Sequence, residues 1–160
     1  MELRDWVKAG VYTPLMFYQV FLAWRRYNSM GLDWAANLGW LILSLSAVFG
    51  WLPIYELRRS GGVQQGRSYI HTTELVTTGV YGVVRHPQFL AGILVITSMM
   101  LLSQHVGSAV AGLVAAAVFA SEVPVADERL VAKFGEPYVR YMGRVPGLNF
   151  ISGVVRLLSR

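Results

Sequence analysis

Two polar stretches of the chain contain most of the side chains that could do chemistry, and the first ends in Arg85-His86-Pro87. Proline is favoured at the first position of a helix, so we predict a helix that begins at Pro87. His86 would then lie at the mouth of this helix, where free backbone N–H groups and the positive end of the helix dipole attract an anion. The alternative, which composition alone favours, is that Arg85 extends toward lipid phosphates and His86 is an ordinary residue of the membrane surface.

The second polar stretch, residues 122–147, contains an acid pair and an arginine. Asp127 and Glu128 could hold a cationic ligand or hydroxyl groups, although the acids of a solvated helix start have the same pattern and are the more common case. Arg144 precedes a Val-Pro pair, and it either faces lipid or binds a carboxylate or phosphate in a bidentate manner. We expect the two polar stretches to fold together into one site.

The composition places these stretches in a membrane protein. Hydrophobic residues make up 54% of the 160 residues and charged residues only 14%, whereas soluble domains carry about 25% charged residues. The sequence has no cysteine, which excludes disulfides, thiolate nucleophiles, cysteine-ligated zinc and iron–sulfur clusters. The small number of histidines also argues against a metal centre.

Uncharged segments predict about four transmembrane helices. Residues 34–55 contain no charge and are long enough to cross a hydrocarbon core of about 30 Å. Residues 87–121 are too long for one span and suit two short spans, with a tight hairpin turn at 103–108 and small residues that favour close packing on the second arm. Residues 9–24 are either a short tilted span, which we favour, or an interfacial helix. A signal peptide fits this segment poorly, because its basic start is weak and no small-residue cleavage site follows.

The distribution of basic residues predicts the orientation. With four spans, all 14 Lys and Arg residues except Arg25 and Arg26 fall on one side. The positive-inside rule then places both termini and the polar stretches in the cytoplasm, and the protein in the cytoplasmic membrane if it is prokaryotic. Nucleic acid binding is disfavoured, because the basic residues flank membrane segments. The length fits one all-α domain of 1–160, with N-terminal spans in residues 1–60 and a catalytic core in residues 64–153.

Local signals also mark a break in the second polar stretch. Gly135 predicts the end of a helix, and Pro137 predicts the start of the next one. Tyr138 and Tyr141 would then share one face of this second helix.

The motifs in these stretches resemble those of the isoprenylcysteine carboxyl methyltransferase family. The first is His71-Thr72-Thr73-Glu74-Leu75-Val76-Thr77-Thr78-Gly79-Val80-Tyr81, followed by Arg85-His86-Pro87. The second is Asp127-Glu128, followed by Phe134-Gly135-Glu136-Pro137-Tyr138 and Arg144-Val145-Pro146. The resemblance extends from Gln64 to Gly153, with both motifs in order around a membrane hairpin. The wider group includes phospholipid N-methyltransferases, small-thiol methyltransferases and, more distantly, sterol reductases.

This resemblance implies S-adenosyl-L-methionine as the cofactor, bound on the cytoplasmic side, and a lipid-soluble acceptor that enters from the bilayer. The expected acceptor is a small molecule or lipid with a carboxylate, and neither a nucleic acid nor a metal is expected to take part. The residues at cofactor-binding positions are His71, Tyr81, Arg85, His86, Pro87, Asp127 and Glu128. The residues expected on the substrate side are Arg144, Glu136 and Arg140. Arg85 and His86 suit the carboxylate of the cofactor, and Glu128 suits its amino group and ribose hydroxyls.

Some positions depart from the family pattern. Asp127 replaces the first Glu of an acid pair, and because the shorter side chain reaches less far, the interpretation gives Glu128 more weight. Phe89 replaces a Tyr, and Pro137 replaces an acid, which makes Glu136 the less secure assignment on the substrate side.

Other functions remain open at this stage. A phospholipid or thiol methyltransferase would need a general base for its acceptor, for which Glu136 or His71 are the candidates. A nicotinamide-dependent sterol or ene reductase is disfavoured, because such chains are much longer and have more spans. A non-catalytic membrane protein is the last alternative.

Overall fold

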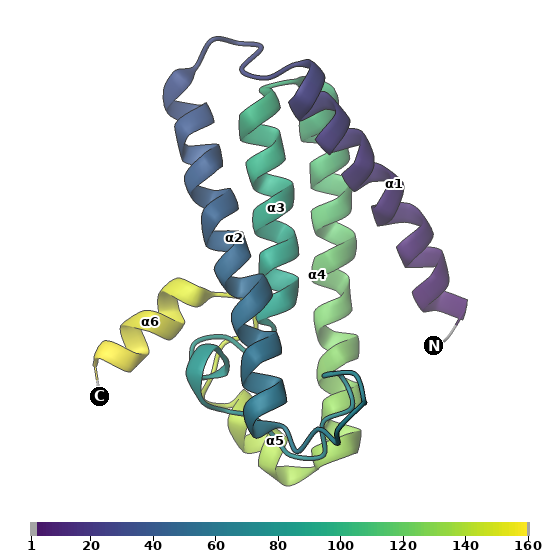
Figure 1. Ribbon diagram of the computed structural model, residues 1–160, viewed down its shortest axis with the longest axis vertical. Coiled ribbons are helices and arrows are strands. Elements are labelled where there is room, and N and C mark those ends of the chain that lie inside the picture. Colours follow the sequence, from purple (N-terminus) through teal and green to yellow (C-terminus); the bar gives the residue numbers. More distant parts are fainter. Residues whose placement is uncertain (1–2, 160) are drawn as a thin grey trace. The chain divides into compact units, whose positions relative to one another are not determined.

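The computed structural model describes residues 3–159, with side chains from residue 10 onward, and all regular structure in that part of the chain is helical (Figure 1). The elements are α1 (Leu3–Arg25), α2 (Asp33–Ser60), the 3₁₀ helix η1 (Gly79–Gly82), α3 (Pro87–Ser103), α4 (Val106–Phe134), α5 (Glu136–Met142) and α6 (Phe150–Leu158). This confirms the all-α prediction. Arg4, Lys8 and Arg160, which contribute to the charge distribution, lie outside the described side chains.

Among the described residues, α2 and α4 are long and apolar enough to cross a membrane. They contain 28 and 29 residues, and only 22% and 17% of their most apolar 18-residue stretches is buried inside the protein. A core helix of a soluble protein would be mostly buried, so these helices offer their apolar side chains to a surrounding apolar phase. The apolar helix α3 is shorter, at 17 residues. The structure therefore supports two membrane-spanning helices, and spans at α1 and α3 stay predictions.

The ends of the helices follow local sequence signals. α3 begins at Pro87, as predicted, and Gln104 has a positive φ of 50° in the turn before α4, which confirms the hairpin at 103–108. Gly135, with φ 64°, separates α4 from α5, although α5 begins one residue before Pro137. The interpretation of Asp127 and Glu128 as a helix start is wrong, since α4 continues through Pro124 and past both acids.

The chain divides into two compact units. One comprises Met1–Ala47 and Ala91–Glu122, and the other comprises Val48–Leu90 and Val123–Arg160. In the first unit, the fully buried Gln19 of α1 donates from Nε2 to the carbonyl of Ser108 at 3.0 Å. A Cβ on Gly112 would lie against the side chains of Gln19 and Met100, so the small residues of α4 do allow close packing, as predicted.

The second unit brings the two polar stretches together. One buried hydrophobic cluster of this unit consists of Tyr138, Tyr141 and Val145. The backbone N–H groups of Arg85 and His86 donate to the carbonyls of Pro146 and Gly147 at 2.9 and 3.1 Å. The segment before α3 is thereby bound to the segment after α5, which confirms that both stretches fold together.

Candidate functional site

Asp127 is the centre of a buried hydrogen-bond network in the second unit. Its Oδ2 accepts from Arg85 Nη2 at 2.9 Å. Its Oδ1 accepts from the hydroxyl of Tyr138 at 2.6 Å and lies 2.7 Å from His86 Nε2. The carboxylate is 8% exposed, so these partners replace the water that it would otherwise bind. Asp127 thus connects α4 to α5 and to the residues that precede α3.

Arg85 also fixes the chain after α5. Its Nη1 donates to the carbonyls of Met142 and Val145, both at 2.9 Å. Its Nε is buried and has no hydrogen-bond partner among the described residues. Nε is therefore a buried donor of Arg85 that a ligand could satisfy.

His86 is a neutral hydrogen-bonding group. Burial lowers the pKa of His86 below its ordinary value of 6.5, although the hydrogen bond to Asp127 acts in the opposite direction. An ionised carboxylate only accepts hydrogen bonds, so Nε2 of His86 carries the proton and donates it to Asp127. In the neutral ring Nδ1 is then an acceptor, which suits an ammonium or hydroxyl group of a ligand better than a carboxylate.

A cavity of about 250 Å³ adjoins this network, and we call it the first cavity. Its aromatic walls come from Tyr81, Phe89, Phe134, Tyr138 and Tyr141. Burial raises the pKa of each of these tyrosines, so their hydroxyls stay neutral at physiological pH. Its polar lining comprises Thr72, Glu74, Arg85, His86, Gln88 and Lys133. A mainly apolar and aromatic cavity with a few polar groups is typical of a small-molecule or cofactor site.

Of the residues at predicted cofactor positions, Tyr81, Arg85, His86 and Pro87 line the first cavity. Asp127 lies behind Arg85 and His86 and holds both of them. Glu128 and His71 are exposed and are not among the lining residues.

Lining residues that sequence reasoning missed include Glu74, Lys133 and Phe134. A signal was present for Phe134, because it follows Asp127 by seven residues and shares a helix face with it. Lys133 Nζ donates to Thr72 Oγ1 at 3.3 Å, a contact between the two polar stretches that no local pattern predicts.

A second cavity of about 620 Å³ contains the predicted substrate-side arginines. Arg140 and Arg144 line it, together with Arg156 of α6, which was not predicted. None of its described lining residues is acidic. Glu136 lies outside the lining and 3.9 Å from Arg140, in a solvent-exposed pair one helical turn apart.

The two cavities share a wall. Leu75 and Tyr141 line both of them. The hydroxyl of Tyr141 donates to the carbonyl of Tyr81 at 2.7 Å, which fixes the ring between them. The two cavities therefore adjoin at the side chains of these two residues.

Comparison with known proteins places the chain in a family. Protein-S-isoprenylcysteine O-methyltransferase B of Arabidopsis thaliana is 28% identical over 130 residues, which cover 74% of this chain and 61% of that protein. Protein-S-isoprenylcysteine O-methyltransferase of Schizosaccharomyces pombe is 32% identical over 99 residues, which cover 56% of this chain and 42% of that protein. The chain thus spans less than two thirds of the length of these relatives. No solved structure matches it significantly.

These relatives confirm the resemblance that the two motifs indicated. The sequence profile of phospholipid methyltransferases matches residues 34–135, from the beginning of α2 to the glycine after α4. The match covers more than half of the chain, so the protein belongs to the phospholipid methyltransferase family.

Proposed function

We propose that the protein transfers a methyl group from S-adenosyl-L-methionine to a carboxylate of a membrane-soluble acceptor. The observation that carries this proposal is the pair of adjoining cavities, one aromatic with a buried polar network and the other lined by arginines without a described acid. Three guanidinium groups would attract a carboxylate and repel an ammonium group. The relatives are named as O-methyltransferases, which agrees with an oxygen acceptor.

The first cavity fits the cofactor. Arg85 Nε is a buried donor without a partner in the described part of the chain, and His86 Nδ1 is an acceptor. Glu74 and Lys133 supply opposite charges for the amino and carboxylate groups, and Phe89 and Phe134 supply apolar surface for the adenine. When bound there, the cofactor supplies an electrophilic methyl group on a sulfonium ion.

The residues of the chain then have to orient the acceptor and exclude water. A carboxylate is already a nucleophile, so methyl transfer to it needs alignment and no general base. Arg144 and Arg140 can hold its two oxygens through bidentate hydrogen bonds. Leu75 and Tyr141, between the two cavities, would limit the entry of water.

An amine acceptor is the second candidate, because the family profile is that of phospholipid methyltransferases. Such an acceptor would need a base to remove its proton. The described lining of the second cavity contains neither a carboxylate nor an imidazole. We therefore consider an amine a less suitable acceptor than a carboxylate.

We also infer that the site faces the cytoplasm. We infer further that α1 and α3 are short spans, so that the chain has four transmembrane helices with α2 and α4. The inference rests on the basic residues of the second unit, which gather beside both cavities, and on the positive-inside rule. The lipid tail of the acceptor would then lie in the bilayer while its carboxylate reaches the arginines.

Substitution of Arg144 tests the proposal, with labelled S-adenosyl-L-methionine as donor and an S-prenylated cysteine as acceptor. Arg144→Ala should leave cofactor affinity nearly unchanged and lower turnover about a hundredfold, because a displacement of about 1 Å can cost that much. Arg144→Lys should restore only part of the rate, since an ammonium group cannot form the same pair of hydrogen bonds. Arg59→Ala, at an exposed arginine at the end of α2, is the control and should retain full turnover.

The same assay identifies the acceptor group. The prenylcysteine with a free carboxylate should be methylated, and its carboxamide should not. Full activity of Arg144→Lys would contradict the role of Arg144. Methylation of phosphatidylethanolamine in preference to the prenylcysteine would show that the acceptor group is an amine and not a carboxylate.

A further inference from the structure

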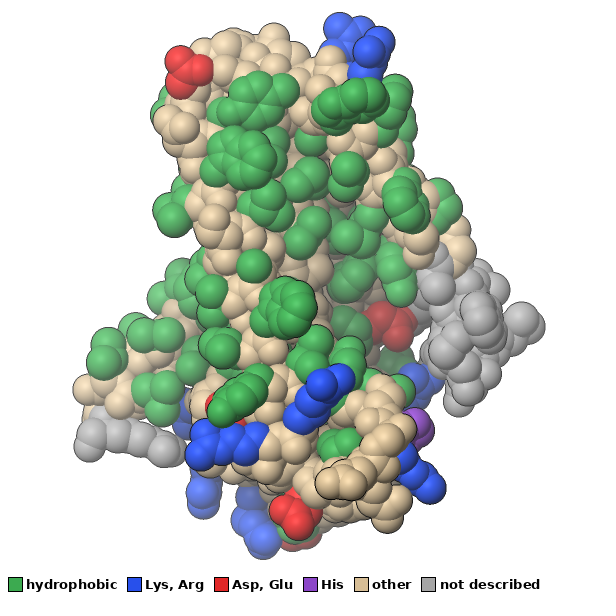
Figure 2. Space-filling view, in the orientation of Figure 1, with side chains coloured by type: hydrophobic (Ala, Val, Ile, Leu, Met, Phe, Trp, Pro, Cys, Tyr) green, Lys and Arg blue, Asp and Glu red, His purple; other side chains and the backbone are tan. Residues whose placement is uncertain are grey.

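The last helix, α6, is amphipathic, but its apolar side faces away from the protein. Six of its nine residues are apolar. At about 100° per residue, Ile151, Val154, Val155 and Leu158 fall on one side, and these side chains are 64%, 40%, 59% and 83% exposed. Hydrophobic side chains cover the visible face of α6 in Figure 2.

The side of α6 that packs on the second unit carries Gly153 and Arg156, and the ring of Phe150 packs at its start. Gly153 is buried against the backbone of Val83, which leaves no room for a Cβ. Arg156 donates from Nη2 to the carbonyl of Gly82. An amphipathic helix on a water-soluble surface has the opposite arrangement, with its apolar side against the core. Four apolar side chains of α6 therefore need an apolar environment that the second unit does not provide.

The position of α6 along α2 indicates what this environment is. The ring of Phe150, at the start of α6, lies 5.8 Å from the ring of Phe49 on α2. Just beyond Phe49, Trp51 and Tyr55 are 77% and 58% exposed. Exposed Trp and Tyr side chains mark the level at which a membrane helix passes through the interface.

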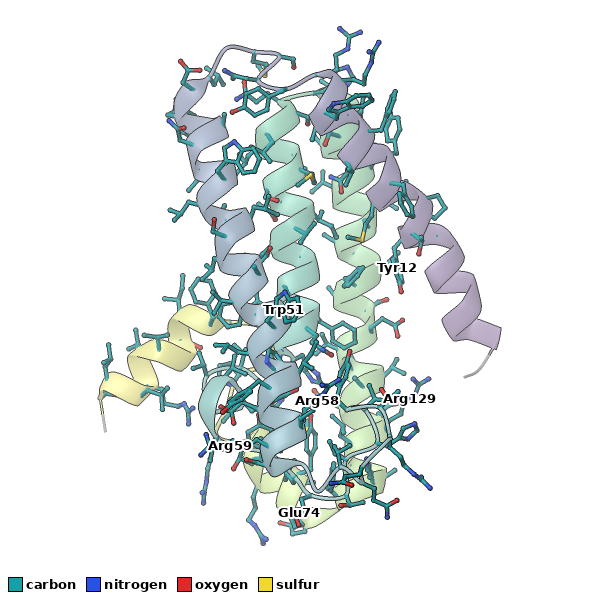
Figure 3. All side chains as sticks on the ribbon, viewed as in Figure 1. Tyr12, Trp51, Arg58, Arg59, Glu74 and Arg129 are labelled. Atoms are coloured by element: carbon teal, nitrogen blue, oxygen red, sulfur yellow. The ribbon has the colours of Figure 1, made fainter. Side chains whose placement is uncertain are left out.

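Charged residues then follow on α2, beginning with Glu56. Arg58 and Arg59 lie in its last turn, beyond Trp51 along the helix (Figure 3). α6 thus starts beside α2 about two helical turns before Glu56, where the charged end of α2 begins, and it extends away from α2 in Figure 1. Its nine residues are too short to cross a bilayer, which takes about 20.

We propose that α6 lies in the plane of the membrane–water interface. Ile151, Val155 and Leu158 would enter the acyl region, as in other interfacial amphipathic helices. Arg156, Arg140 and Arg144 line the second cavity on the other side of α6, where their charge complements anionic lipid headgroups. The partner is therefore a phospholipid bilayer surface. This placement does not depend on the proposed methyl transfer.

A second copy of the chain is a less suitable partner for this face. A stable protein interface buries about 800 Å² on each partner and involves about 20–30 residues on each side. The exposed apolar face of α6 consists of four side chains. The lipid-exposed surface of α2 continues from it, through Trp51 and Tyr55.

The absence of cysteine from the sequence makes a direct test possible. The whole protein would carry one cysteine with a nitroxide label, in Ile151→Cys, Val155→Cys or Leu158→Cys, in vesicles of phosphatidylcholine and phosphatidylglycerol. Ser152→Cys and Ser159→Cys are matched controls from the polar side of the same segment. Labels on the apolar side should collide several-fold more often with oxygen, which concentrates in lipid, than with a water-soluble nickel chelate. Labels at the two serines should collide more often with the nickel chelate than with oxygen.

Two outcomes would overturn the proposal. Labels at 151, 155 and 158 that are as accessible to the nickel chelate as the serine labels would place this face in water. Line broadening from nearby spins, removed by dilution with unlabelled protein, would show that a second copy covers it. Because the readout is made on several positions, one variant that fails to fold does not prevent the comparison.

Discussion

At the scale of single residues, two adjacent acids have different environments. Asp127 is buried and accepts from Arg85, His86 and Tyr138, whereas Glu128 is exposed on the same helix. The sequence identified the pair of acids, and Glu128 was favoured as the cofactor-binding acid because its side chain is longer. Which acid points inward depends on the rotation of α4, and this rotation is set by its apolar neighbours Leu130 and Phe134, which pack against Tyr138 and Tyr141.

We expect Asp127→Asn to lower the free energy of unfolding in detergent by about 3 kcal/mol or more, because the change leaves the buried guanidinium of Arg85 without its counter-charge. Glu128→Gln is the neighbouring control and should change the free energy of unfolding by no more than about 0.5 kcal/mol. Denaturant unfolding of both variants measures the difference. Equal stability of the two variants would show that Asp127 does not hold the network together.

The buried histidine predicts a pH dependence of stability. The pKa of His86 in the folded protein is lowered by burial, so below its ordinary value of 6.5 the unfolded chain binds a proton that the folded chain does not. Stability should therefore be retained above about pH 6.5 and fall as the pH decreases through the lowered pKa. Unfolding midpoints between pH 5 and 8 measure this slope, and His86→Gln should reduce it. An unchanged slope in His86→Gln would assign the pH dependence to another group.

At the scale of elements, the sequence predicted the boundaries that depend on local chemistry. The start of α3 at Pro87, the hairpin before α4 and the break at Gly135 all follow from proline, turn and glycine signals. The sequence did not predict that one helix runs from Val106 to Phe134, because Asp127 and Glu128 were interpreted as a helix start. A helix needs backbone hydrogen bonds and not apolar side chains, so it can continue beyond the lipid.

Gly135 gives a prediction about the connection between α4 and α5. Its φ of 64° and ψ of −142° belong to a region that is nearly exclusive to glycine, and a Cβ would meet no atom within 4 Å. Gly135→Ala should therefore destabilise through backbone strain alone, by about 1–3 kcal/mol. Gly143→Ala is the control at the other end of α5, where φ is −67°, and it should be neutral or stabilising by up to about 1 kcal/mol. Thermal unfolding compares the two, and an equal loss in both variants would contradict the strain at Gly135.

The second unit also shows what the sequence could not predict about the site. The motif positions gave Tyr81, Arg85 and His86 as cavity residues. Glu74, Lys133 and Arg156 reach the two cavities only because long-range packing brings α4, α6 and the loop with η1 together. Contacts between residues so far apart in the chain carry no periodic signal, which is why local patterns did not identify them.

At the scale of the whole molecule, the distribution of charge and three hydrogen bonds between side chains and backbone carbonyls lead to the same topology. In the first unit, Ser29 Oγ donates to the carbonyls of Ser103 and Gln104, and Gln104 Nε2 donates to that of Leu32. The loop before α2 and the turn before α4 therefore lie at the same end of the first unit. Only Arg25 and Arg26 are basic near these turns, so this end is expected to face away from the cytoplasm.

This topology can be tested because α2 separates two accessible positions in a chain without cysteine. Met30, in the loop before α2, is 68% exposed, and Gln64, after α2, is also exposed. In intact cells a membrane-impermeant thiol reagent should label Met30→Cys and should not label Gln64→Cys until the cells are lysed, since the basic residues after α2 hold that end in the cytoplasm. Labelling of Gln64→Cys in intact cells, with Met30→Cys protected, would reverse the orientation. The arginines of the second cavity would then face away from the cytoplasm, where the cofactor is made, and the proposed methyl transfer could not take place there.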